Sequence, residues 1–288
     1  MRSPSAHVPP TIARCWFCGY SVPHAKRRLG QHFLTDPRLL ARIADALEAG
    51  PQDTVLEIGP GLGGLTAPLV QRAGRLIAIE KDRQLVPALR SRFPTVEVIE
   101  GDALDVDWHA LGPADGSGLL VTGNIPYNIT SPLIDKALLP PRPRRTVFLV
   151  QKEVAERITA APGTSEYGAL SIGVQSVARA DRLFTVPAGA FKPRPKVDSA
   201  VLRMTPLGQP LVTDDERQSF RALVVGLFGF RRKQLLRGLR EFTGWQSDAA
   251  AAVLARAEVL ETVRPEVLSP PEFVRLYRTL VDGGWSMR

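Results

Sequence analysis

The chain has 288 residues, of which 44% are hydrophobic and 23% charged, and its formal net charge is +8. This length can bury one large core plus a small domain, and no apolar stretch approaches the roughly 18 residues of a membrane span, so we expect a cytoplasmic protein that crosses no membrane. The positive charge favours a polyanionic partner, nucleic acid ahead of a membrane surface, with an ordinary arginine-rich composition as the alternative.

Residues 1–25 precede the first predicted element and contain both cysteines, Cys15 and Cys18. A zinc site normally needs four ligands, and His24 is the only nearby candidate for a third, so we expect no metal and no disulfide framework. The segment lacks the continuous apolar core of a secretory signal. We predict a poorly ordered extension, with a weak transit-like peptide or an upstream start codon as alternatives.

Strands and helices alternate from residue 35 onward. An Asp ahead of Pro37 and the later Gly50 are start and stop signals for a first helix. The next segments are a strand, glycine-rich turn and helix (53–74), a strand (75–82), a helix broken near Pro87 (84–93), a third strand (96–106), a fourth (118–127), and a fifth running into a helix (145–158). This order implies βαβ units and a parallel sheet with both faces covered, with ligands beyond the carboxyl ends of the strands.

From about Thr213 the pattern indicates only helices, with turns at residues 242–248 and 268–273. We therefore predict a catalytic domain over residues 26–208 and a small helical domain over residues 209–288. Between Arg217 and Arg240 there are seven basic residues and no acidic one. Such a stretch suits contact with RNA phosphates, and a merely solvated basic face is the alternative. The RNA-binding candidates are Arg231, Arg232, Lys233 and Arg237.

The glycines of "GPGLGG", Gly59, Gly61 and Gly64, match G-x-G-x-x-G between a strand and a helix. Glycine lets the backbone approach a ligand closely, and the helix start presents free N–H groups. Glu80 lies 21 residues after Gly59, at the end of the next strand, where a carboxylate can accept both hydroxyls of a ribose. The pattern favours an adenosine-containing cofactor over a tight turn without a ligand.

Nicotinamide dinucleotide and S-adenosyl-L-methionine both fit this turn. Glu57, beside the glycines, would be unfavourable near a pyrophosphate but tolerable near a sulfonium and its amino group. Asp102, after the third strand, can accept a hydrogen bond from an adenine amine, or it serves only as a surface or capping residue. No Ser–His–Asp arrangement is evident, so the chemistry should come from the cofactor.

The stretch "NIPY", Asn124 to Tyr127, follows the fourth strand. If the acceptor is an exocyclic amine on a base, the Asn124 amide oxygen and the Ile125 carbonyl can accept its N–H groups and aim the nitrogen at a methyl group. Pro126 has no N–H of its own, and Tyr127 can stack on the extracted base. A strand-ending turn with a packed tyrosine is the alternative.

These motifs resemble those of the ribosomal RNA adenine dimethyltransferases, most closely the bacterial small-subunit branch. They run in family order from about residue 26 to 204 and continue through "FGFRRKQLLRGL" to the C-terminus: "RRLGQHFL", "EIGPGLGGLT", "IEKD", "EGDAL", "GNIPYNITSPL", "QKEVAERI", "YGALSI" and "FKPRPKVDSAV". The resemblance implies a Rossmann-like class I S-adenosyl-L-methionine-dependent methyltransferase with a small C-terminal helical domain. It implies dimethylation of the exocyclic amines of two adjacent adenines near the 3′ end of small-subunit (16S) rRNA.

The resemblance also implies roles for single residues. It places Gln31, His32 and Leu34 beside the cofactor, Gly59 and Gly61 beneath its methionine part, Glu80 on the ribose, Asp102 on the adenine amine, Asn124 on cofactor and target, and Phe191 on the target base opposite Tyr127. Asn124, Pro126, Tyr127 and Phe191 form the implied catalytic set. The family usually has Asn where this chain has His32; because imidazole also forms hydrogen bonds, we expect retained binding with some pH dependence.

The implied partner is a partly assembled small ribosomal subunit, and we expect the protein to act on it as a monomer. One rival is a large-subunit adenine methyltransferase of the antibiotic-resistance type, against which "VDSAV" and "FRRKQLLRGL" argue. Another is a non-catalytic RNA-binding assembly factor, against which the intact Asn124, Glu80 and Asp102 argue, although they leave room for a second, assembly-checking role. A dehydrogenase is the least favoured reading.

Overall fold

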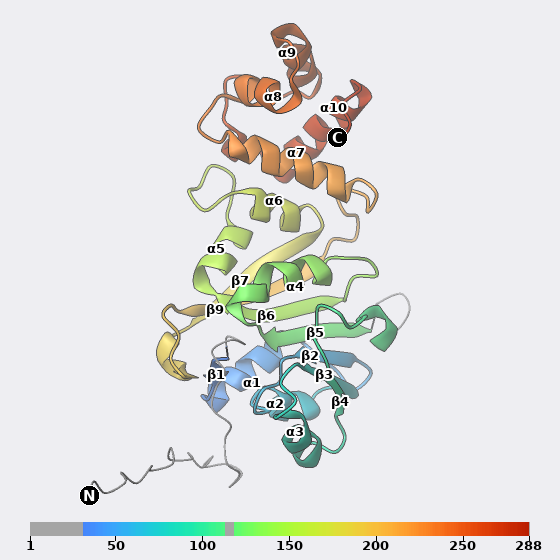
Figure 1. Ribbon diagram of the computed structural model, residues 1–288, viewed down its shortest axis with the longest axis vertical. Helices are drawn as coiled ribbons and strands as arrows, with labels where there is room; N and C mark the ends of the chain where they lie inside the picture. The colour runs from blue at the N-terminus through green and yellow to red at the C-terminus, as the bar shows by residue number, and fades with distance from the viewer. Residues whose placement is uncertain (1–30, 113–117, 288) are drawn as a thin grey trace, which may run out of the picture.

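The computed structural model describes residues 31–112 and 118–287 (Figure 1). The predictions for residues 1–25, with Cys15 and Cys18, lie outside the described residues. In Figure 1 a sheet flanked by helices makes up the middle and lower parts of an elongated molecule, and a group of helices lies at the upper end. No helix within the described ranges is long and apolar enough to span a membrane.

The central feature is a seven-stranded sheet in the order β4-β3-β2-β5-β6-β9-β7. Its strands are β2 (Thr54–Ile58), β3 (Arg75–Glu80), β4 (Glu97–Glu100), β5 (Leu119–Asn124), β6 (Arg145–Gln151), β7 (Ala178–Val186) and β9 (Ser199–Pro206). The parallel sheet is confirmed for β2 to β6. The other edge of the sheet was not predicted, and there β9 runs antiparallel to β6 and to β7.

Helices cover both faces of this sheet. They are α1 (Pro37–Ala46), α2 (Thr66–Val70), α3 (Val86–Arg92), α4 (Thr130–Ala137), α5 (Lys152–Thr159) and α6 (Ala169–Gln175), with short 3₁₀ helices η2 (His109–Leu111), η3 (Tyr127–Ile129), η4 (Ala188–Ala190) and η5 (Pro265–Val267). Alternate residues of one strand enter different cores: Val147 and Leu149 pack in one cluster, Phe148 and Val150 in the other. Burial on both sides explains the continuous apolar runs of the central strands.

Two helix boundaries show how local signals acted. The Asp36 side chain accepts hydrogen bonds from the N–H groups of Arg38 and Leu39, so the predicted start of α1 is confirmed. The expected break at Pro87 is wrong, because α3 begins at Val86 and places this proline in its first turn, where a missing N–H costs nothing.

The C-terminal part is helical, as predicted: α7 (Arg217–Gly229), α8 (Leu235–Thr243), α9 (Ser247–Arg256) and α10 (Pro270–Asp282). Its core is continuous with that of the sheet, since Leu223 and Leu227 belong to the same cluster as Phe148 and Val150 of β6. The Tyr167 hydroxyl also donates to the Leu268 carbonyl at 2.8 Å. The division at residue 208 stays a prediction.

A separate two-stranded sheet joins β1 (Phe33–Leu34) to β8 (Phe191–Lys192), with Leu34 opposite Phe191. It was not predicted, because two-residue strands leave no periodic signal. A hydrogen bond of 3.1 Å from the Thr35 N–H to the Ala190 carbonyl extends the pairing. This sheet brings the segment before α1 to the carboxyl edge of the main sheet.

Candidate active site

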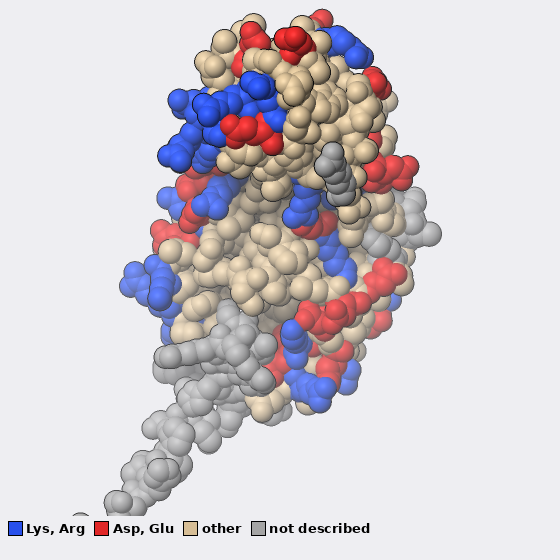
Figure 2. Space-filling model, turned by 45° about the horizontal axis from the view of Figure 1, so that its top comes forward, with Lys and Arg blue, Asp and Glu red and all other residues tan. Residues whose placement is uncertain are grey.

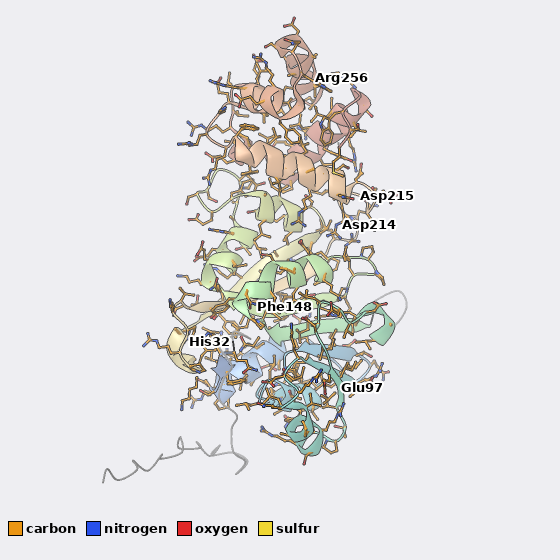
Figure 3. All side chains as sticks on the ribbon, viewed as in Figure 1. His32, Glu97, Phe148, Asp214, Asp215 and Arg256 are labelled. Carbon is orange, nitrogen blue, oxygen red and sulfur yellow. The ribbon has the colours of Figure 1, made fainter. Side chains whose placement is uncertain are left out.

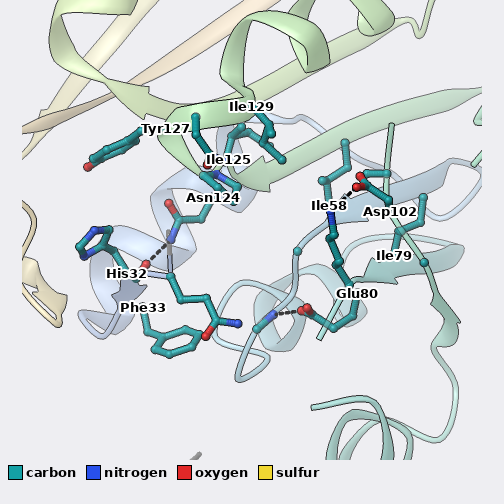
Figure 4. Close-up of a pocket in the computed structure, with 18 residues that line it drawn as sticks. His32, Phe33, Ile58, Ile79, Glu80, Asp102, Asn124, Ile125, Tyr127 and Ile129 are labelled. Carbon is teal, nitrogen blue, oxygen red and sulfur yellow. Dashed lines mark hydrogen bonds and ion pairs between the residues drawn. The ribbon is translucent and has the colours of Figure 1, made fainter. Parts of the chain in front are cut away.

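A pocket opens beyond the carboxyl ends of β2 and β5, the neighbours from which the sheet extends in both directions (Figure 4). Open α/β sheets bind ligands at such a switch point. The lining residues come from the segment around β1, the ends of β2 and β3, the turn after β4, and the end of β5 with η3. They are Gln31, His32, Phe33, Ile58, Gly59, Gly61, Ile79, Glu80, Lys81, Gly101, Asp102, Ala103, Asn124, Ile125, Pro126, Tyr127, Asn128 and Ile129.

The glycine turn forms one wall of this pocket. Gly59 and Gly61 have φ values of 64° and 58°, which favour glycine. A Cβ atom on Gly61 would lie 2.8 Å from Cε1 of Phe33, so β1 packs directly on the turn. Gly64 does not line the pocket; a Cβ atom there would lie 3.3 Å from Leu40 Cδ1, so this glycine serves packing.

Glu80 is 5% exposed at the end of β3. Its Oε2 accepts from the Gly61 N–H at 2.9 Å, and its Oε1 accepts from the Asp82 N–H at 2.7 Å. Burial raises the pKa of Glu80, and the hydrogen bonds from Asp82 and Gly61 oppose this only in part. Each carboxylate oxygen has more than one acceptor position, so this side chain can still receive the two hydroxyls of a ribose.

Asp102 forms an ion pair with Lys81, which follows the neighbouring strand β3 and also lines the pocket. Its Oδ1 accepts from the Leu104 N–H at 3.0 Å. Partial burial acts to raise the pKa of Asp102, but the hydrogen bonds from Lys81 and Leu104 outweigh it, and the pKa is lowered overall. Asp102 is therefore an ionised acceptor at neutral pH. Sequence reasoning missed Lys81, because a single lysine after a strand carries no recognisable signal.

Glu57 lies in β2, 1% exposed, and does not line the pocket. Thr66 Oγ1 donates to its Oε2 at 2.6 Å, which ties β2 to the start of α2. Burial raises the pKa of Glu57 to about 8. A neutral carboxyl group outside the pocket cannot discriminate between nicotinamide dinucleotide and S-adenosyl-L-methionine. The charge of Glu57 therefore gives no support to either cofactor.

Asn124 ends β5 and faces the segment before α1. Its Nδ2 donates to the His32 carbonyl at 2.6 Å. Because a carbonyl only accepts, this bond fixes the orientation of the amide and turns Oδ1 away from His32 (Figure 4). The next residue, Ile125, is held by a 3.1 Å bond from its N–H to the Leu149 carbonyl. An oriented amide oxygen at a strand end can accept hydrogen bonds from a ligand.

Two rings lie at the mouth of the pocket. The Tyr127 and His32 rings stack, with centroids 5.8 Å apart and planes inclined by 25°. The Tyr127 hydroxyl is 3.0 Å from Ser199 Oγ, and burial raises the pKa of Tyr127. The His32 Nδ1 donates to the Pro193 carbonyl at 2.7 Å, since that oxygen can only accept.

The structure brings most of the predicted site together. Lining the pocket are Gln31, His32, Gly59, Gly61, Glu80, Asp102, Asn124, Pro126 and Tyr127. Leu34 and Phe191 do not line it: they are 7% and 3% exposed and pack in the core beneath the β1–β8 pair. Stacking of Phe191 on a base stays a prediction, and it requires this ring to leave its present packing.

The basic stretch, Arg217 to Arg240, runs along α7, through the turn that follows it and along α8. In Figure 2, Lys and Arg gather over the upper part of the molecule, with acidic side chains close by. Arg231 pairs with Glu266 at 3.4 Å. Lys233 and Arg237 both pair with Glu241. Among the described residues, Arg232 and Arg240 have no ion-pair partner. The structure therefore distinguishes paired from unpaired cations, which the sequence alone could not do.

No group of three or more His, Cys, Asp or Glu side chains in the described ranges could hold a metal ion. The pocket instead suits an adenosine. Its acceptors are the Glu80 carboxylate, which is held by two backbone hydrogen bonds, and the ionised carboxylate of Asp102, and its glycine turn leaves room for the ligand. These residues fit the nucleoside part of the cofactor that the sequence predicted.

Two solved structures resemble most of the chain. A dimethyladenosine transferase from Plasmodium falciparum matches with a TM-score of 0.78 and 28% identity, covering 88% of this chain and 98% of that one. The 23S rRNA methyltransferase ErmE matches with a TM-score of 0.69 and 28% identity, covering 86% and 99%. Together the sheet and its pocket define a class I S-adenosyl-L-methionine-dependent methyltransferase.

The sequence comparisons identify the family of methyltransferases to which the chain belongs. Residues 22–280 match the family model described as ribosomal RNA adenine dimethylase, and the chain belongs to this family. A relative from Geobacter sulfurreducens, named ribosomal RNA small subunit methyltransferase A, is 43% identical over 270 residues, covering 91% of this chain and 98% of the relative. One of the same name from Aromatoleum aromaticum is 45% identical over 232 residues, covering 80% and 85%.

Proposed function

We propose that this enzyme dimethylates the exocyclic amines of two adjacent adenines near the 3′ end of small-subunit rRNA during maturation of the subunit. The observation that carries the proposal is the 43% identity to a small subunit methyltransferase A over 98% of that protein's length. We further infer that it acts as a monomer, in the cytoplasm, on a partly assembled subunit.

S-adenosyl-L-methionine supplies the electrophilic methyl group. Glu80 accepts the ribose hydroxyls, and its burial keeps water from competing for them. Asp102 accepts the adenine amine, which requires it to share or release Lys81. The backbone of Gly59 and Gly61, with Gln31 and His32 opposite, borders the remainder of the cofactor.

Asn124 and Ile125 orient the attacking amine. The nitrogen lone pair of an adenine amine is delocalised into the ring, so the amine is a poor nucleophile. Acceptors on both N–H groups hold the nitrogen in place and favour a geometry in which the lone pair points at the methyl group. The bond from Asn124 Nδ2 to the His32 carbonyl supports this role, because it leaves Oδ1 as the acceptor.

Tyr127 provides a surface for the target base, which leaves its helix to reach the pocket. The bond between its hydroxyl and Ser199 Oγ and the contact with the His32 ring hold the tyrosine ring in place. The ring is half-buried, so one part remains accessible to a base.

Modification of large-subunit RNA is the second candidate, because ErmE also matches 86% of this chain. Its 28% identity is well below the 40% or more of the small-subunit relatives. A non-catalytic RNA-binding factor is disfavoured by the intact acceptors at Glu80, Asp102 and Asn124 around one pocket.

The test is transfer of labelled methyl groups from S-adenosyl-L-methionine to small subunits that lack the modification, with large-subunit RNA in parallel. We expect label on small subunits alone. Label on large-subunit RNA alone would move the protein to the other branch, and tight subunit binding without transfer would support the non-catalytic role.

A further inference from the structure

A short basic segment, Lys192–Lys196, contacts His32, one of the residues that line the pocket. We call it the basic arch. Its three cations, Lys192, Arg194 and Lys196, are all exposed, and none forms an ion pair with any residue that the structure describes. In Figure 1 the arch follows β8 and forms the loop at the left of the molecule, beside β1. Free cations this close to a site for an extracted base call for an anionic partner.

Hydrogen bonds connect the chain at both ends of the basic arch to residues that line the pocket. Near its start, the Pro193 carbonyl accepts from His32 Nδ1 at 2.7 Å. Just beyond its end, Ser199 Oγ lies 3.0 Å from the Tyr127 hydroxyl. The backbone of Asp198, between them, accepts from the Lys152 N–H at 3.0 Å.

The two anchors are also linked to each other. The His32 and Tyr127 rings stack, and the His32 carbonyl accepts from the Asn124 amide. The arch, the two rings and the amide thus form a closed set of contacts. A displacement of the arch would act on the side chains that would orient the target base and its amine.

We propose that the basic arch binds the phosphates next to the target adenine, and that His32 is a positioning residue that fixes the arch relative to Tyr127 and Asn124. The proposal rests on the proposed function in taking RNA as substrate. A base drawn out of its helix leaves its own phosphates at the pocket mouth. Contacts to phosphates set register and orientation rather than sequence preference, which is the contribution that a site for one extracted base requires.

The first test compares two single-charge variants, Arg194→Ala and Arg256→Ala. Arg256 is exposed on α9, at the far end of the molecule from His32 (Figure 3), so it controls for the loss of one positive charge. We expect Arg194→Ala to raise the KM for RNA about 3- to 10-fold and to reduce the salt dependence of binding, with the Kd for S-adenosyl-L-methionine unchanged. Equal effects of the two variants would overturn the phosphate role.

The second test separates the two contacts of His32. An Asn at this position keeps an N–H donor for the Pro193 carbonyl but has no ring, and a Phe keeps a ring but has no donor. We expect His32→Asn to retain most of kcat and His32→Phe to lower kcat about tenfold, the size of one lost hydrogen bond in a site. The reverse order of kcat values would overturn the positioning role of this bond.

A double-mutant cycle closes the argument. If His32 fixes the arch, Arg194→Ala should cost at least about threefold less in the His32→Phe background than in the wild type. Independent effects would contradict the coupling. The cycle is measured with small subunits and with large-subunit RNA, so a protein that modifies only the latter would refute the proposed function while still testing the arch.

Discussion

At the scale of single residues, the amide of Asn124 is the group on which we propose that methyl transfer depends most directly. Its nitrogen is held by the His32 carbonyl, which leaves its oxygen as the proposed acceptor for the target amine. We expect Asn124→Ala to lower kcat by about 100- to 1,000-fold, the typical cost of losing one oriented donor or acceptor at a reacting centre.

The control is Asn128→Ala. Asn128 also lines the pocket, but it is exposed and follows Tyr127 in the chain. Its loss should change kcat less than tenfold, and RNA binding should be within twofold of the wild type for both variants. Equal losses of kcat would show that Asn124 has no special role.

Glu57 makes stability depend on pH. Its pKa is about 8 in the folded protein against an ordinary value of 4.5. Between these values the folded form holds a proton that the unfolded chain has lost, so the free energy of unfolding falls as pH rises, by up to about 1.4 kcal/mol per pH unit.

The variant Glu57→Gln keeps an acceptor for Thr66 and carries no titrating group. We expect the decrease in Tm from pH 5 to 8 to be smaller in this variant than in the wild type. Some decrease should remain, because the pKa of Glu80 is also raised. Identical pH dependence of Tm in the two proteins would contradict the neutral state of Glu57.

At the scale of elements, the turn between β2 and α2 requires glycine for two reasons. Gly61→Ala places a Cβ atom in a left-handed conformation and against the Phe33 ring. Because the Gly61 N–H also holds Glu80, we expect at least a tenfold rise in the Kd for S-adenosyl-L-methionine, measured by calorimetry.

A matched control is Gly163→Ala. Gly163 has a φ of 83° and no atom within 4 Å of an added Cβ, so it suffers the backbone strain without the clash. This variant should lose stability and keep the affinity for the cofactor. A similar loss of affinity in both variants would attribute the effect to general destabilisation.

The same scale shows what the sequence could predict. The cap at Asp36, the glycine turn and the carboxylate at Glu80 follow from spacing along the chain, and all were predicted correctly in position. Contacts between distant segments were not: the antiparallel β7 and β9, the β1–β8 pair that buries Phe191, and the pairing of Lys81 with Asp102. Such contacts depend on the fold and leave no local pattern.

The basic stretch illustrates the same limit between elements. Counting cations between Arg217 and Arg240 treats all of them alike, yet four of them form ion pairs with Asp135, Glu241 or Glu266, which lie outside this range. Only the folded structure reveals that Arg232 and Arg240 form no ion pair with any residue in the described ranges.

This distinction predicts unequal effects on RNA binding. We expect Arg232→Ala to reduce the slope of log K against log salt by about 0.7 to 0.9, the value for one lost phosphate contact. Lys233→Ala removes a cation that shares Glu241 with Arg237, and it should reduce the slope by less than half as much. Equal reductions would place Lys233 in contact with phosphate as well.

At the scale of the whole molecule, one continuous core connects the sheet to the helical part, so the pocket and the basic helices are held in a fixed relation. In the proposed function, RNA that binds the helical part would therefore be presented to the pocket in one register. This rigidity suits the proposed modification of two adjacent adenines among many similar ones.

The most direct test of the account is to locate the methyl groups. Small subunits lacking the modification are incubated with the protein and S-adenosyl-L-methionine, and the 3′-terminal rRNA fragment is examined by mass spectrometry. We expect dimethyladenine at two adjacent positions in this fragment, and none with Asn124→Ala. Methyl groups confined to large-subunit RNA, or absent from both RNAs, would contradict the account.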